Sequence, residues 1–260
     1  MPICSRRFVV PLLLGLSLLI ATGSTVRAAD PVIPLPADAK AELDKRLGAG
    51  VVGAAVPAPP LQAPMSYAPK EGTVLNYQVV DSDGNHWNED HHFVKSTEPQ
   101  FAPGMSYAIE KVSTEYMQEN GGNLIVVGEK DLKQSVITTF SPGEPLVLAG
   151  LQAGQSRQVA VAVKVADISD PTDITHTGTL NITYTYIGAY KVTVPAGTYD
   201  AALIRWDYNG EVGPASIADT YYRLIAPGAG LIAMVEKVSI SAMLFYHDNT
   251  KLGKQLAKAP

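Results

Sequence analysis

Cysteine is almost absent from this chain, and its scarcity limits the chemistry available. Cys4 is the only cysteine in 260 residues and lies in the amino-terminal segment. The remainder therefore has no disulfide, no cysteine metal ligand and no cysteine nucleophile. Runs of basic residues are also missing, and the formal net charge is −5. An acidic chain without a basic patch is a poor nucleic-acid binder, so we expect no nucleic-acid partner.

Motifs of catalysis are missing too. The chain has no Gly-x-Ser-x-Gly elbow, and its serines are scattered through predicted strands and turns. We therefore expect neither an enzyme nor a cofactor. The competing hypothesis is a metal-dependent enzyme, with Asp90 and His92 as weak candidate ligands because they share one face of a predicted strand. Two ligands fall short of the three or four in a typical zinc site, so a solvated polar strand is the favoured interpretation.

Long apolar runs are confined to the amino terminus. Residues 8–21 form an apolar segment of about 14 residues, preceded by two arginines and followed by small residues. This length is typical of a secretory signal and is shorter than the roughly 20 residues of a membrane span. We predict a signal peptide over residues 1–28, whose removal takes away three arginines and no acidic residue and lowers the charge to −8. The predicted location is periplasmic or secreted, and the processed protein is not expected to be an integral membrane protein.

Helical periodicity is scarce in the rest of the chain. Residues 29–70 are rich in proline and alanine and predict a linker or arm, either a tether or disordered, with at most one short helix at 37–47. Residues 71–248 predict about 11 antiparallel strands separated by turns, and residues 249–260 a flexible tail. The predicted fold class is all-β. We expect a single large curled antiparallel sheet, a half-barrel or barrel-like meander, because a flat sheet would leave its edges exposed.

The clearest strand pattern runs from Thr179 to Tyr208. Aliphatic and aromatic residues alternate there with polar ones, which is typical of a half-buried strand. We predict three strands, with a break at Gly188 and a tight turn at 195–197, where proline and glycine supply the turn chemistry.

Part of this stretch resembles a known group of proteins. The motif KVTVPAGTYD at 191–200, the pair Tyr221-Tyr222 and the turn APGAGLI at 226–232 resemble the turns and strands of exported bacterial β domains. That group is similar in fold to the LolA and LolB lipoprotein carriers, whose concave sheet face can hold an acyl chain. The resemblance covers about 152–246. It implies an architecture and, with it, a lipid or other apolar ligand, but no catalytic residue.

Aromatic residues of the central strands are the candidate binding residues. Tyrosine combines an apolar ring with a hydrogen-bonding tip, so it suits either a cavity wall or an ordinary sheet surface. We expect a non-catalytic domain that binds an apolar or amphipathic ligand, or an envelope component, on its concave face; the alternative is an envelope scaffold that binds other proteins. The candidate ligand-binding residues are Tyr184, Tyr186, Trp206 and Tyr222. The pattern leaves open whether this face is a cavity or a packed core.

Overall fold

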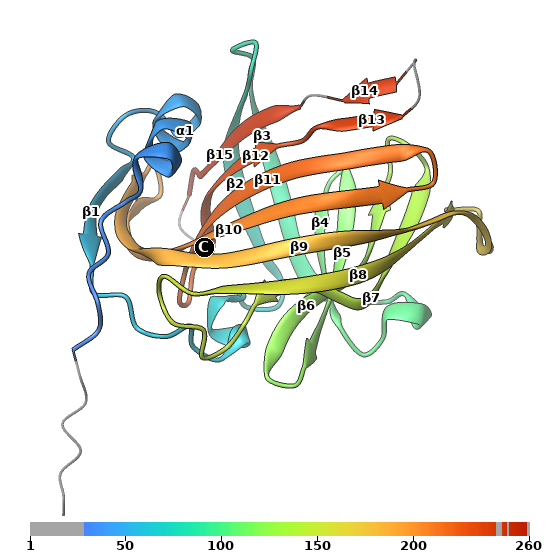
Figure 1. The fold of residues 1–260 in the computed structure, drawn as a ribbon, viewed down its shortest axis with the longest axis horizontal. Coiled ribbons are helices and arrows are strands. Elements are labelled where there is room, and N and C mark those ends of the chain that lie inside the picture. The colour runs from blue at the N-terminus through green and yellow to red at the C-terminus, as the bar shows by residue number, and fades with distance from the viewer. Residues whose placement is uncertain (1–28, 243–245, 249, 259–260) are drawn as a thin grey trace, which may run out of the picture.

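Twelve strands of the described chain pair edge to edge into a closed antiparallel barrel (Figure 1). The structure, a computed structural model, describes residues 29–242, 246–248 and 250–258, so the predicted signal peptide at 1–28 lies outside the described residues. In order around the barrel the strands are β2 (Thr73–Asp81), β3 (His86–Lys95), β4 (Met105–Ile109), β5 (Ser113–Asn120), β6 (Asn123–Asp131), β7 (Val136–Val147), β8 (Ser156–Asp167), β9 (Asp170–Val194), β10 (Gly197–Val212), β11 (Ala215–Ala226), β12 (Gly230–Lys237) and β15 (Lys251–Leu256). The predicted all-β antiparallel fold is confirmed, and its sheet closes completely.

Closure depends on β15, which the sequence predicted to be part of a flexible tail. β15 pairs with β12 on one side and with β2 on the other, so it joins the two ends of the meander. The prediction of a tail over 249–260 is therefore wrong for 251–256. Lys254 occupies an inward position of this short strand, 4% exposed, between Leu252 and Leu256. A buried lysine interrupts the apolar alternation by which a strand is recognised.

The predicted break at Gly188 and the proline–glycine pair at 142–143 both belong to bulges within longer strands. Gly188 does not end a strand: β9 is continuous, and its register with β10 shifts so that Ile187 has no partner residue. The Ser141-Pro-Gly143 segment lies inside β7, where the register with β6 shifts, and Gly143 has a φ of 122°. Glycine and proline mark β-bulges as well as turns, and the local sequence does not distinguish them. The turn at 195–197 is present, so 179–208 forms two strands rather than three.

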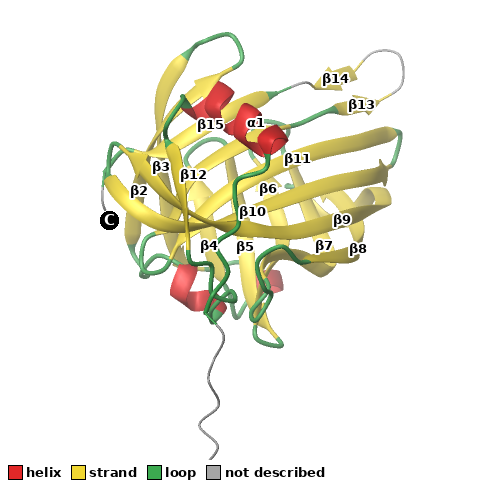
Figure 2. Ribbon diagram, turned by 60° about the vertical axis from the view of Figure 1, so that its left-hand side comes forward, coloured by secondary structure: helices red, strands yellow, loops and turns green. Residues whose placement is uncertain are grey.

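The proline- and alanine-rich arm is packed against the barrel. Its helix α1 (Ala37–Leu47) has the predicted bounds and buries Ala39, Leu43 and Leu47. Because Gly253 of β15 lacks a side chain, the backbone of Arg46 can approach closely; an added Cβ would lie 2.4 Å from the Arg46 carbonyl oxygen. The arm is thus an ordered part of the fold, on the outside of the sheet (Figures 1 and 2).

After the helix, the arm continues along the barrel to one of its ends. Strand β1 (Val52–Val56) adds to the edge of β9, and the 3-10 helix η1 (Pro64–Tyr67) lies at that end (Figure 2). The other short elements are η2 (Pro99–Phe101), β13 (Ile240–Ala242) and β14 (Tyr246–Asp248). Within the described residues, no helix combines the length and apolar character needed to cross a membrane.

Candidate ligand-binding site

The barrel interior contains a chamber of about 880 Å³ that opens at one end. Exposed residues of two turns line this end: Ser82 and Asp83 between β2 and β3, and Lys133 and Gln134 between β6 and β7. Deeper in the chamber the lining comes from inward-facing residues of β5, β10, β11 and β12. Binding pockets for small molecules usually measure roughly 300–1,000 Å³, so the chamber has the size of a ligand site.

The chamber wall is strongly acidic. Nine carboxylates and four basic side chains line it. The carboxylates are Asp81, Asp83, Glu89, Glu115, Glu129, Asp131, Glu144, Asp219 and Glu236, and the basic groups are Lys133, Arg223, Lys251 and Lys254. Charges rarely face inward in a barrel without a function or a fixed partner.

A second, apolar pocket of about 90 Å³ lies toward the other end of the barrel. Side chains of the barrel and of the arm line it together, including Phe93, Met117, Ile225 and Leu231 from the strands and Tyr67 from η1. The arm therefore helps to close this end. A cavity of roughly 150 Å³ holds one benzene molecule, so this pocket has room for the end of a hydrocarbon chain rather than for a whole acyl chain.

The chamber and the pocket adjoin each other. They share four lining residues, here called the neck: Ile109, Glu115, Arg223 and Met234. The Arg223 guanidinium carbon lies 5.0 Å from the centroid of the Trp206 ring, so the cation packs over the face of this ring. Arg223 Nη2 donates to Glu115 Oε1 over a long 3.4 Å. The neck thus places one cation between an apolar and a polar space.

Two glutamates near the neck lose their charge through burial. Burial, followed by repulsion from Glu115, raises the pKa of Glu129 and of Glu144 to about 8. Both carboxyls are therefore largely protonated at neutral pH and can donate a hydrogen bond. The Tyr208 hydroxyl lies 3.4 Å from Glu144 Oε2, and burial raises its pKa well above the ordinary value, so it stays protonated as well.

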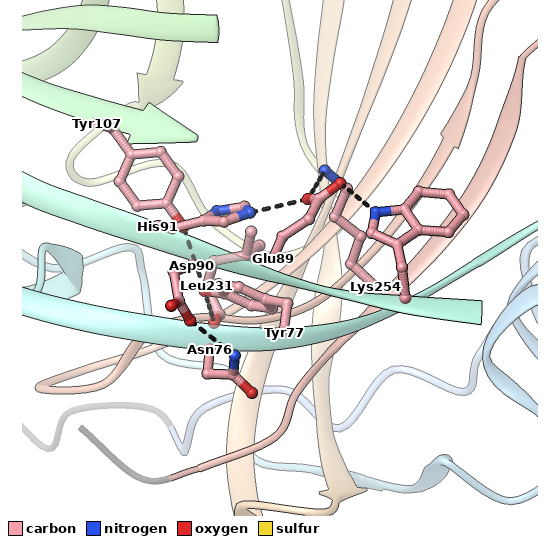
Figure 3. A network of polar contacts seen from close by, with 9 residues as sticks. Asn76, Tyr77, Glu89, Asp90, His91, Tyr107, Leu231 and Lys254 are labelled. Atoms are coloured by element: carbon pink, nitrogen blue, oxygen red, sulfur yellow. Dashed lines mark hydrogen bonds and ion pairs between the residues drawn. The ribbon is translucent and has the colours of Figure 1, made fainter. Parts of the chain in front are cut away.

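A different group of polar residues, centred on Glu89, is closely bonded within the barrel wall (Figure 3). The Glu89 carboxylate accepts hydrogen bonds from Trp87 Nε1 at 2.8 Å and from Lys254 Nζ at 2.7 Å. His91 Nε2 lies 3.0 Å from the same carboxylate, and His91 Nδ1 lies 2.8 Å from the Tyr107 hydroxyl. We call these five residues the wall network.

The pKa values of the wall network follow from these contacts. Burial alone would raise the pKa of Glu89, but hydrogen bonds from His91, Lys254 and Trp87 and the charge of Lys254 bring it down to about 2. Burial lowers the pKa of His91 more than the Glu89 carboxylate raises it. Neutral His91 therefore donates from Nε2 to Glu89 and accepts at Nδ1 from the Tyr107 hydroxyl.

Three of the predicted binding residues come together, in the packed core. Tyr184 and Trp206 pair across β9 and β10 with ring centroids 5.2 Å apart, and Tyr186 lies one inward position further along β9. All three are at most 2% exposed, and none lines the chamber or the pocket. Their polar tips donate to carbonyl oxygens of Leu146, Pro145 and Pro59. Their shared face is a core that supports the site, and a direct role in binding stays a prediction.

The fourth predicted residue, Tyr222, is separated from the other three. It is 3% exposed and belongs to the same apolar cluster as Ala39 and Leu43 of α1, on the opposite face of the sheet from Trp206. The guanidinium of Arg205 lies 5.7 Å from its ring centroid. Tyr222 therefore helps to hold the arm against the barrel.

The weak metal candidates also lie outside the chamber. Asp90 accepts a hydrogen bond from Asn76 at 2.7 Å, and His92 lies 3.2 Å from Glu110. Both alternate with the inward-facing Glu89 and His91, so they face outward. No group of three or more His, Cys, Asp or Glu side chains that could hold a metal occurs within the part of the chain that the structure describes.

Sequence analysis did not select the residues that line the site. Tyr208, Tyr221, Arg223 and Glu144 are inward-facing members of strands whose other inward residues are mainly apolar. The sequence does contain one indication of these residues: a charged side chain stands among alternate positions that are otherwise apolar or aromatic, as in Tyr221-x-Arg223-x-Ile225. Without the pairing of the strands, that signal does not show that these groups meet.

Three solved structures are similar to this one at low sequence identity. An inferred exported protein with a YmcC-like fold from Bacteroides fragilis NCTC 9343 aligns over 77% of this chain and 99% of its own, with 10% identity and a TM-score of 0.44. An inferred lipoprotein from Parabacteroides distasonis ATCC 8503 aligns over 78% and 99%, with 14% identity and a TM-score of 0.38. The hypothetical lipoprotein YmcC from Escherichia coli (K12) aligns over 73% and 89%, with 8% identity and a TM-score of 0.37. No family model matches the chain, and no curated protein matches it significantly.

Proposed function

We propose that this protein is a non-catalytic, exported binding protein that holds a small amphipathic ligand inside its barrel. The observation that carries the proposal is the junction of a polar chamber of about 880 Å³ with an apolar pocket of about 90 Å³. A ligand with a short hydrocarbon end and a polar body would match this division. The turn motif that resembles exported β domains similar to lipoprotein carriers agrees with such a role.

Methionine methyl groups provide a direct test. Met117 and Met234 line the pocket, whereas Met65 is 43% exposed and lies outside it. In the purified protein labelled with ¹³C at the methionine methyl groups, titration with 1-octanol is expected to shift the Met117 and Met234 resonances and to leave Met65 unchanged. Saturable shifts would give the dissociation constant.

A pocket-filling variant locates the ligand independently. Ile225→Phe adds volume to the pocket wall and is expected to weaken octanol binding at least tenfold. Val94→Phe adds the same ring at an outward site that is 40% exposed and should leave binding unchanged. If octanol shifts no methionine, or shifts Met65 alone, the proposed function is wrong.

A further inference from the structure

The unused hydrogen-bonding capacity of Arg223 identifies the polar end of the ligand. A guanidinium carries five N–H donors in a fixed fork. Among the described residues, the hydrogen bond that this guanidinium donates is the long one from Nη2 to Glu115, and Nε is buried with no hydrogen-bond partner. The Arg223 side chain is 18% exposed, so bulk water reaches little of it. A guanidinium that is short of acceptors in a largely buried position is costly, and a ligand that supplies acceptors to its accessible N–H groups would reduce that cost.

The surroundings of Arg223 favour an oxyanion there. Glu115, Tyr208, Tyr221 and Glu236 act electrostatically on Arg223, and Arg223 acts on Glu144. Glu129 and Asp219 line the same chamber. Since burial keeps Glu129 and Glu144 protonated at neutral pH, they offer donors rather than negative charges. Burial also raises the pKa of Glu236 and of Tyr221. The chamber is acidic by composition but rich in donors around the neck.

The position of Arg223 fixes the geometry of the ligand. Its side chain lines both the apolar pocket and the chamber. We propose that the barrel binds a carboxylate with a short to medium hydrocarbon chain, whose head is held by the fork of Arg223 on the chamber side of the neck. Its chain passes the neck beside Ile109 and Met234, so that only the tail end enters the pocket beside Ile225 and Leu231. Planar, bidentate binding of a carboxylate is the geometry that a guanidinium provides best. This inference rests on the proposed function.

Three probes of equal length separate the possible head groups. Octanoate, 1-octanol and octylamine carry the same chain with an anionic, a neutral and a cationic head. At pH 6.5, titrations of the ¹³C-methionine protein are expected to show octanoate binding at least tenfold more tightly than octanol and octylamine binding more weakly than either. Arg223→Gln should remove the tenfold preference, so that octanoate and octanol bind this variant with similar affinity. Its far-UV circular dichroism spectrum and cooperative thermal unfolding would show that the variant is folded.

An exposed arginine provides the control, and each contrary outcome overturns a different proposal. Arg157 is exposed on β8, and Arg157→Gln should retain the full preference for octanoate. If octanol binds at Met117 and Met234 but octanoate binds no better, or if octylamine binds best, the carboxylate inference is overturned and the proposed function stands. If Arg223→Gln keeps the preference, Arg223 is not the anchor. If none of the three probes binds, both proposals fail.

Discussion

The wall network and the neck are two buried polar regions in one barrel, and they differ in how well their charges are paired. In the wall network, Glu89 and Lys254 are 9% and 5% exposed at their side chains and lie 2.7 Å apart, and Glu89 accepts two further contacts. At the neck, Arg223 makes one long hydrogen bond within the described part of the chain, where its buried Nε has no hydrogen-bond partner. A buried charge that is paired depends on its partner, and loss of that partner destabilises the fold, whereas a buried charge short of partners can be paired by a ligand. The comparison therefore separates structural from binding residues.

Breaking the wall network should have the largest effect. Lys254→Met removes the cation from beside a buried carboxylate, and loss of one partner of a buried pair costs about 3–5 kcal/mol in the free energy of unfolding. Urea denaturation would measure the loss. The control is Lys191→Met at an ion pair with side chains 54% and 62% exposed, where a change below about 1 kcal/mol is expected. Equal losses in the two variants would contradict the structural role of the network.

The pH dependence of stability should have opposite signs in the two regions. Glu129 and Glu144 have folded pKa values of about 8, above their ordinary value of 4.5, so the folded protein holds these protons more tightly. The stability they contribute is complete below about pH 4.5 and is lost as the pH rises through about 8. Glu89, with a folded pKa of about 2, contributes stability above about pH 4.5 that is lost as the pH falls toward 2.

A double variant isolates the contribution of the two glutamates. Glu129→Gln with Glu144→Gln replaces the protonated carboxyls by neutral amides, so the fall in stability between pH 5 and pH 8.5 should become flatter. Guanidinium midpoints at three pH values would show it. Glu71→Gln, at a side chain 53% exposed, is the control and should keep the original slope. An unchanged slope in the double variant would mean that these carboxyls are already ionised at neutral pH.

Removing the neck cation should cost much less stability than removing Lys254. Arg223→Met keeps an apolar stem against Trp206 and loses one long hydrogen bond, so we expect a decrease of at most about 1.5 kcal/mol. The same urea titration measures it. A loss as large as that of Lys254→Met would show that Arg223 is a structural residue and would remove the contrast between the two regions.

The smallest changes in stability are expected at two tyrosines of β9, which differ in whether their hydroxyl is hydrogen-bonded within the described structure. The Tyr186 hydroxyl donates to the Pro59 carbonyl of the arm at 3.1 Å, so Tyr186→Phe should cost about 1 kcal/mol. The Tyr190 hydroxyl is buried with no hydrogen-bond partner in the described structure, so Tyr190→Phe should be neutral or slightly stabilising. Thermal unfolding of the two variants would compare them, and a larger loss for Tyr190→Phe would contradict the assigned contacts.

Much of the fold could be predicted from the sequence because period-two alternation is a local property. The strand at 180–186, the helix at 37–47 and the turn at 195–197 all follow from patterns within a few residues. β15 could not be recognised, since its inward Lys254 is explained only by Glu89, far away in the chain. The bulge beside Gly188 cannot be distinguished from a turn in the sequence, because glycine occurs in both.

The candidate site could be predicted only in its general character. An interior with aromatic residues follows from the alternation of Tyr184 and Trp206, but whether a given inward residue meets a cavity depends on the shear and closure of the barrel. Arg223 and Glu144 come from strands that are distant in sequence, β11 and β7. Their proximity at the neck is a property of strand pairing, which single-strand patterns do not contain.

A crystal structure with 8-bromooctanoate tests the central claim most directly, because the anomalous signal of bromine locates the end of the chain. The proposed binding predicts one strong bromine site in the apolar pocket among Phe93, Met117 and Leu231, with the carboxylate within hydrogen-bond distance of Arg223. Bromine found only on the outer surface of the barrel, with the pocket and the chamber empty of ligand, would contradict it.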